Sequence, residues 1–113
     1  AAAEVAAAVA SSRLLPEGFK AAGPPARPLL EDAKEGAALV GRRLMYNWPG
    51  HGWCEGQIKE RNTKKGLKID GDAVNFLVHY PVDDDTSRHV LSLDTYASDE
   101  CAPPNSWFLL EEL

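Results

Sequence analysis

Segments in which apolar and polar residues alternate, separated by turn-forming residues, make up most of the chain after residue 39. The clearest of them is AVNFLVHY at residues 73–80, in which every second side chain is apolar. Because side chains alternate between the two faces of a strand, this pattern predicts a β-strand with one buried face. The residues that share the apolar face are Val74, Phe76, Val78 and Tyr80.

The same two-residue period predicts four further strands. One of them, SWFLLEE, is apolar on both faces and is expected to be buried on both sides. Glycine, proline or aspartate marks the connections, and DTYAS after the fourth strand predicts a single helical turn. Five short strands within about 70 residues close most economically as a small antiparallel barrel, which has no exposed edge. In chain order the predicted strands cover residues 40–48, 54–58, 73–80, 86–93 and 106–112.

The first third of the chain has a different composition. It is rich in alanine and then in proline, and it holds one of the nine aromatic residues, Phe19. Residues 1–15 have high helix propensity and predict either a short helix or a partly ordered linker. The prolines that follow break regular structure. We therefore expect an Ala/Pro-rich, partly helical arm at residues 1–38 and one folded β domain at residues 39–113.

Composition and charge disfavour several classes of protein. A net charge of −5 argues against a protein that binds nucleic-acid phosphates over its whole surface. Two cysteines, Cys54 and Cys101, without a signal peptide are expected to be free thiols in a reducing, intracellular compartment. No apolar run approaches the ~20 residues that span a bilayer, so we expect no membrane span. The chain begins with alanine, which indicates a processed product or a piece of a larger protein.

Four segments together, VGRRLMYNWP, GWCEGQI, NFLVHYPVDDDTSRHVLSLDTYA and SWFLL, resemble the Tudor-like domains of the chromatin-reader superfamily. The resemblance covers roughly residues 39–110. It depends on a glycine before the first strand, an aromatic residue at its end, GWxxGxI in the second strand, VxY in the third and an acidic corner. Chromo-like and Agenet modules share parts of this pattern. The resemblance implies a five-stranded Src-homology-3-type barrel that binds proteins, and it slightly favours the nucleus.

Tudor-like members that bind ligands enclose a methylated Lys or Arg in an aromatic cage. Ring faces attract the poorly hydrated cation, and a carboxylate supplies the opposite charge. The resemblance carries these positions onto Trp48, Tyr80, Asp83 and Asp85, whereas Cys54 and Asp83 stand where cage-forming members often have a ring. A further ring, Trp53, falls on the other strand face and could contribute only if the turn rotates it.

Each of these residues also has a structural interpretation. Trp48 and Tyr80 lie at the ends of their strands, where aromatic rings are usually half exposed. For these two residues, a role in core packing and a role in ligand binding are about equally expected. Tyr46 and Phe76 share the parity of aliphatic residues and are expected in the core, as is Trp107. The three consecutive aspartates could equally form a solvated turn, since Asp is favoured there.

Catalytic and metal chemistry find little support in the sequence. The histidines and cysteines lack the C-x2-C or H-x3-H spacing of a zinc site, and His79 and His89 are expected on outward strand faces. Cys54 follows no activating base, and the neighbouring Glu55 would raise its pKa. We therefore expect no enzyme activity, no bound metal and no cofactor.

Three interpretations of function follow. The first is a non-enzymatic module that reads methylated Lys or Arg peptides. The second is a structural or adaptor barrel that docks into a larger assembly through its N-terminal arm, which has too little apolar content to fold alone. The third and weakest is local nucleic-acid contact through a basic hairpin, which could equally be a solvated tip. The residues of that hairpin are Arg61, Lys64, Lys65 and Lys68.

Overall fold

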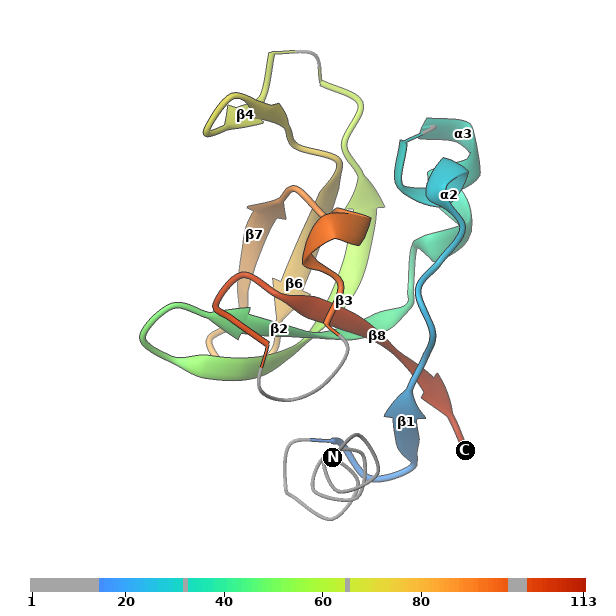
Figure 1. Ribbon diagram of the computed structural model, residues 1–113, viewed down its shortest axis with the longest axis vertical. Helices are drawn as coiled ribbons and strands as arrows, with labels where there is room; N and C mark the ends of the chain where they lie inside the picture. The colour runs from blue at the N-terminus through green and yellow to red at the C-terminus, as the bar shows by residue number, and fades with distance from the viewer. Residues whose placement is uncertain (1–14, 32, 65, 98–101) are drawn as a thin grey trace.

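The computed structural model describes residues 15–31, 33–64, 66–97 and 102–113, and within them the chain is mainly β (Figure 1). Six strands form one antiparallel sheet in the order β1-β8-β2-β3-β6-β7, and β4 pairs with β5 in a separate hairpin. The elements in chain order are β1 (Phe19–Ala21), α2 (Arg27–Glu31), α3 (Ala33–Gly36), η1 (Ala37–Leu39), β2 (Arg43–Trp48), β3 (Gly52–Arg61), β4 (Lys68–Ile69), β5 (Asp72–Ala73), β6 (Phe76–Tyr80), β7 (Asp85–His89), η2 (Leu93–Thr95) and β8 (Trp107–Glu112).

The five strands predicted by alternation are present as β2, β3, β6, β7 and β8, and the single turn predicted after the fourth is η2. The expectation of a closed barrel is wrong, because the sheet among the described residues is open, with β1 and β7 at its edges. Figure 1 shows β3 bending so that β6 and β7 cross the direction of β2 and β8. The sheet therefore wraps around one core without joining its two edge strands.

The fourth strand ends earlier than its sequence suggests. β7 stops at His89, and the side-chain amide of Asn75 binds both backbone groups of Leu91, donating to its C=O and accepting from its N–H, at 2.8 Å each. The Asn75 side chain thus makes the two hydrogen bonds to Leu91 that the backbone of a neighbouring strand would otherwise make. The chain then leaves the sheet and enters η2. At the opposite edge, β1 pairs with β8 from Phe19 to Ala21.

The main core lies on the concave side of the sheet. It gathers the inward side chains of all the longer strands together with residues from α2 and η1, and Trp107 and Phe76 are its largest fully buried members. Both were expected in the core, and both lie there. The members of this cluster are Leu30, Leu39, Leu44, Tyr46, Ile58, Phe76, Val78, Tyr80, Leu91, Trp107 and Leu109.

A smaller cluster covers the other face of β2 and β8. Met45 and Phe108 are paired across the two strands, and Leu110 is buried beside them. This cluster explains why SWFLLEE is apolar at consecutive positions, since β8 is buried on both faces as its sequence predicts. Phe19 from β1 packs against the same cluster.

Residues assigned from sequence to the N-terminal arm contact the β domain. β1 extends the sheet, and Leu30 of α2 enters the main core, where it joins Leu39, the first residue assigned to the β domain. The helix expected at residues 1–15 lies, except for Leu15, outside the described residues. Among the described helices, none is long and apolar enough to cross a membrane.

Candidate functional site

Four rings carried by β2, β6 and β7 meet on the inner side of the curved sheet. The centroid of Trp48 lies 5.1 Å from that of Tyr46, 5.4 Å from that of Tyr80 and 5.1 Å from that of His89. Tyr46 and His89 are closer still, at 4.3 Å. Centroid separations of this size mean that the rings touch one another, so no space for a methylated ammonium lies between them. We refer to Tyr46, Trp48, Tyr80 and His89 as the ring cluster.

The buried members of the ring cluster satisfy their polar atoms internally. The hydroxyl oxygen of Tyr80 lies 2.8 Å from Nε2 of His89, and the hydroxyl of Tyr46 donates to Oδ1 of Asn105 at 3.1 Å. Burial raises the pKa of both phenols and lowers the pKa of His89 to about 4. All three side chains are therefore neutral at pH 7.

The expected outward position of the His89 side chain is wrong, because His89 is 3% exposed and belongs to the ring cluster. His89 is the cross-strand partner of Phe76, and directly paired residues point to the same side of a sheet. Leu91 is two residues after His89, so the two side chains share one face, and both are buried. The apolar Leu91 is therefore the feature of the sequence that could have identified the face of His89 as the inward one. The outward assignment of His79, which is half-buried, agrees with the structure.

Trp48 is the half-buried member of the ring cluster and lies at its edge. Cys54, also half-buried, packs against the same core and carries a free thiol. Burial raises the pKa of that thiol, and the carboxylate of Asp83 raises it further. The rings of Trp48 and Tyr80, both predicted from the sequence as ligand contacts, lie against each other with centroids 5.4 Å apart.

Gly56 explains how Tyr80 reaches its place in the ring cluster. A Cβ atom at Gly56 would lie 2.7 Å from Cγ1 of Val78 and 2.8 Å from Cε1 of Tyr80. Separations below 3.0 Å are not tolerated between carbon atoms of a packed core, so only glycine leaves room for the Tyr80 ring on β3.

Trp53 does not join the ring cluster. Its ring lies 5.2 Å from that of Phe108, in the small cluster on the other face of the sheet. Strand alternation alone accounts for this position, because Trp53 pairs with Asn47 rather than with an inward residue of β2. The turn at residues 49–52 does not rotate Trp53 toward Trp48.

The acidic corner between β6 and β7 is exposed. The carboxylate of Asp84 lies 3.3 Å from Nε2 of His79, and Asp85 accepts a hydrogen bond from the backbone N–H of Thr86. Two of the three aspartates therefore have local partners that suit a turn. The neighbouring Val82 is 81% exposed, so this corner presents an apolar side chain among the acids.

The basic residues expected at a hairpin tip are separated. Nη1 of Arg61 donates to the carbonyl oxygens of Asn62 and Asn75 at 2.7 and 2.8 Å, and its Nη2 donates to that of Glu31. The Arg61 guanidinium thus ties β3 to α2. Lys64 and Lys68 are exposed, and Lys65 lies outside the described residues.

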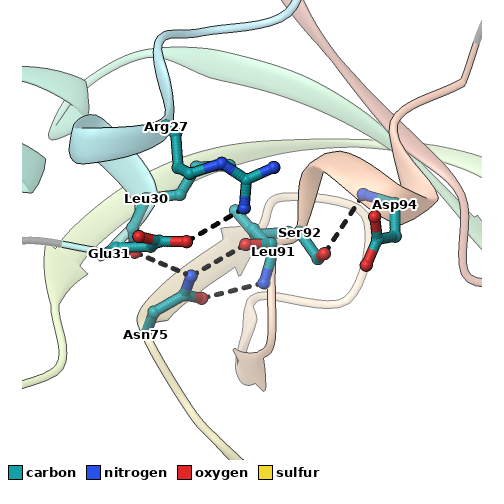
Figure 2. Close-up of polar contacts among 7 residues, drawn as sticks. All are labelled: Arg27, Leu30, Glu31, Asn75, Leu91, Ser92 and Asp94. Carbon is teal, nitrogen blue, oxygen red and sulfur yellow. Dashed lines mark hydrogen bonds and ion pairs between the residues drawn. The ribbon is translucent and has the colours of Figure 1, made fainter.

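A groove of about 530 Å³ lies beside Arg61, between α2, the chain after β3 and the segment that links β7 to η2. Asn75 is one of its lining residues, and Figure 2 shows its hydrogen bonds to the backbone of Leu30 and of Leu91. None of the four ring-cluster residues lines this groove, although Val90, which does, directly follows His89.

In the described part of the chain, no three acidic, His or Cys side chains converge as metal ligands would. No protein-family model, curated protein or solved structure matches this chain.

Proposed function

We propose that this domain is a non-enzymatic interaction module that binds the methylated side chain of a Lys or Arg residue against Trp48. The observation that carries the proposal is the half-buried Trp48 ring in contact with Tyr80, and the negative charge of Asp83 is near enough to raise the pKa of both Cys54 and Tyr80. A methylated cation prefers an aromatic face to water, and a nearby carboxylate adds Coulomb attraction.

Contact between the rings determines what kind of site this is. Because Trp48 touches three other rings, the cation would lie on the outer face of Trp48 and would not be enclosed. An exposed cation–π contact contributes roughly 0.5–1 kcal/mol, so one ring face and one acid support only a weak complex. We expect a dissociation constant on the order of 1 mM, which corresponds to about −4 kcal/mol.

Two tryptophans on opposite faces of the sheet give the experiment a matched control. Binding of a trimethyl-lysine peptide is measured by calorimetry or fluorescence for Trp48→Ala, Asp83→Asn, Trp53→Phe and Asp84→Asn. The first two variants are expected to lose or weaken binding while keeping the fold, and the last two to bind like the parent chain. Equal binding by the Trp48→Ala and parent chains contradicts the proposal.

The burial of the other rings favours a second candidate, a structural or adaptor domain. Tyr46, Tyr80 and His89 are buried and bonded to one another or to the protein, as core residues are. For this candidate Trp48→Ala unfolds the domain, and no methylated peptide binds the parent chain. Residues 19–31, part of the arm expected to dock elsewhere, pack on the domain itself, so docking would depend on other surfaces.

A further inference from the structure

The groove beside Arg61 has an apolar floor. Leu30, Val74 and Leu91 are buried beneath it, and Val90 and Leu93 are half-buried along its side. A volume of about 530 Å³ is within the range of roughly 300–1,000 Å³ that is typical of ligand sites. The groove is therefore large enough for two or three amino-acid side chains.

The walls of the groove are fixed by one side chain. The amide nitrogen of Asn75 donates to the carbonyl of Leu30 at 3.2 Å and to that of Leu91 at 2.8 Å, while its oxygen accepts from the N–H of Leu91 (Figure 2). These bonds tie the last turn of α2 to the segment after β7. A groove held in this way is formed before a ligand arrives, so binding does not have to order it.

The charges around the groove are not balanced. Arg27 and Glu31 of α2 form an ion pair with each other at 3.1 Å. Arg61 donates only to backbone carbonyls, and neither Arg61 nor Lys64 forms an ion pair with another described residue. Asp72 is the remaining acid on the rim. The groove is thus net positive on a chain whose net charge is −5, so it attracts an acidic ligand.

We propose that this groove binds a short peptide segment of a partner protein, in which an Asp or Glu residue lies next to an aliphatic residue. The carboxylate accepts hydrogen bonds from Nη2 of Arg61 and from the Lys64 ammonium, and the aliphatic side chain covers Leu91 and Leu93. This site is separate from Trp48 and does not depend on methyl-lysine binding.

The test selects random 12-residue peptides on the full 113-residue chain and measures the enriched peptides individually. We expect Asp or Glu beside Leu, Ile or Val in the enriched sequences, and amide NMR shifts at Leu91 and Leu93. Lys64→Glu should weaken binding about tenfold, because it reverses a rim charge. Lys68→Glu makes the same charge change outside the groove and should leave binding unchanged. Leu93→Ala should weaken binding because it removes apolar contact along the side of the groove.

Four results would overturn the proposal. One is the absence of any enriched acidic-aliphatic sequence. Another is equal binding by the Lys64→Glu and parent chains. A third is amide shifts centred on Trp48. The fourth is stronger binding of a 12-nucleotide single-stranded DNA at the same amides, which would make the groove a phosphate site.

Discussion

The hydroxyl oxygen of Tyr80 and Nε2 of His89 lie 2.8 Å apart, and each side chain is 3% exposed. Because burial raises the pKa of the phenol and lowers that of the imidazole, both groups are uncharged when they meet. A neutral imidazole can accept a hydrogen bond from the phenol, which a charged one cannot. This pair fixes β7 against β6 beneath Trp48.

Acid should weaken the fold through His89. Burial lowers its pKa to about 4, whereas an unfolded chain takes up the proton near 6.5. The stability due to neutral His89 is therefore complete above pH 6.5 and is lost as the pH falls to about 4. A shift of this size corresponds to about 3 kcal/mol in the free energy of unfolding. Urea unfolding between pH 7 and pH 4 measures it.

The matched variant for this experiment is His89→Gln, which keeps a hydrogen-bonding group but does not titrate. Its free energy of unfolding should be lower at pH 7 and should fall less steeply between pH 6.5 and 4. Identical slopes for the two chains would mean that other groups cause the acid sensitivity.

Gly56→Ala should destabilise the domain by about 1–3 kcal/mol, since the added methyl group overlaps Val78 and Tyr80. Gly23→Ala is the control, because no other atom lies within 4 Å of a Cβ at that position. Urea denaturation compares the two variants with the parent chain. Wild-type stability in Gly56→Ala would show that the Tyr80 ring does not pack on β3 as described.

Asn75→Ala should destabilise the domain by about 3 kcal/mol, because it leaves backbone groups of Leu30 and Leu91 without partners. The effect should also be local. The amide proton of Leu91, bonded only to Asn75 among the described residues, should exchange much faster. The amide of Ile58, bonded to the carbonyl of Arg42, is the internal reference. Equal loss of protection at both amides would indicate global unfolding instead.

Alternation of side chains was sufficient to predict most of the sheet. Val74, Phe76 and Val78 follow the two-residue period because β6 has one buried face, and the consecutive apolar residues of β8 reflect burial on both faces. The aromatic residues expected at the ends of β2 and β6 do meet, since the same alternation turns them to one side. Trp53 falls on the opposite face for the same reason.

Features that depend on backbone pairing or on single polar side chains could not be predicted. β1 is only three residues long, and it is held by the backbone of β8 rather than by an apolar pattern. Asn75 and Arg61 resemble ordinary surface residues in the sequence, yet their hydrogen bonds to carbonyls shape the groove and end the fourth strand. Closure of the barrel was predicted from strand number alone, which contains no information about where β7 ends.

The ring of Trp48 is the proposed contact for a methylated cation. The most direct test is an amide and indole NMR spectrum of the parent chain during titration with trimethyl-lysine and dimethyl-arginine peptides and their unmethylated counterparts. We predict saturable shifts at the Trp48 indole and at Asp83, with half-saturation on the order of 1 mM and no shift of the Trp53 indole. Absence of any shift at several times that concentration, about 5 mM, or equal shifts with the unmethylated peptides, would contradict the claim and leave the ring cluster as core.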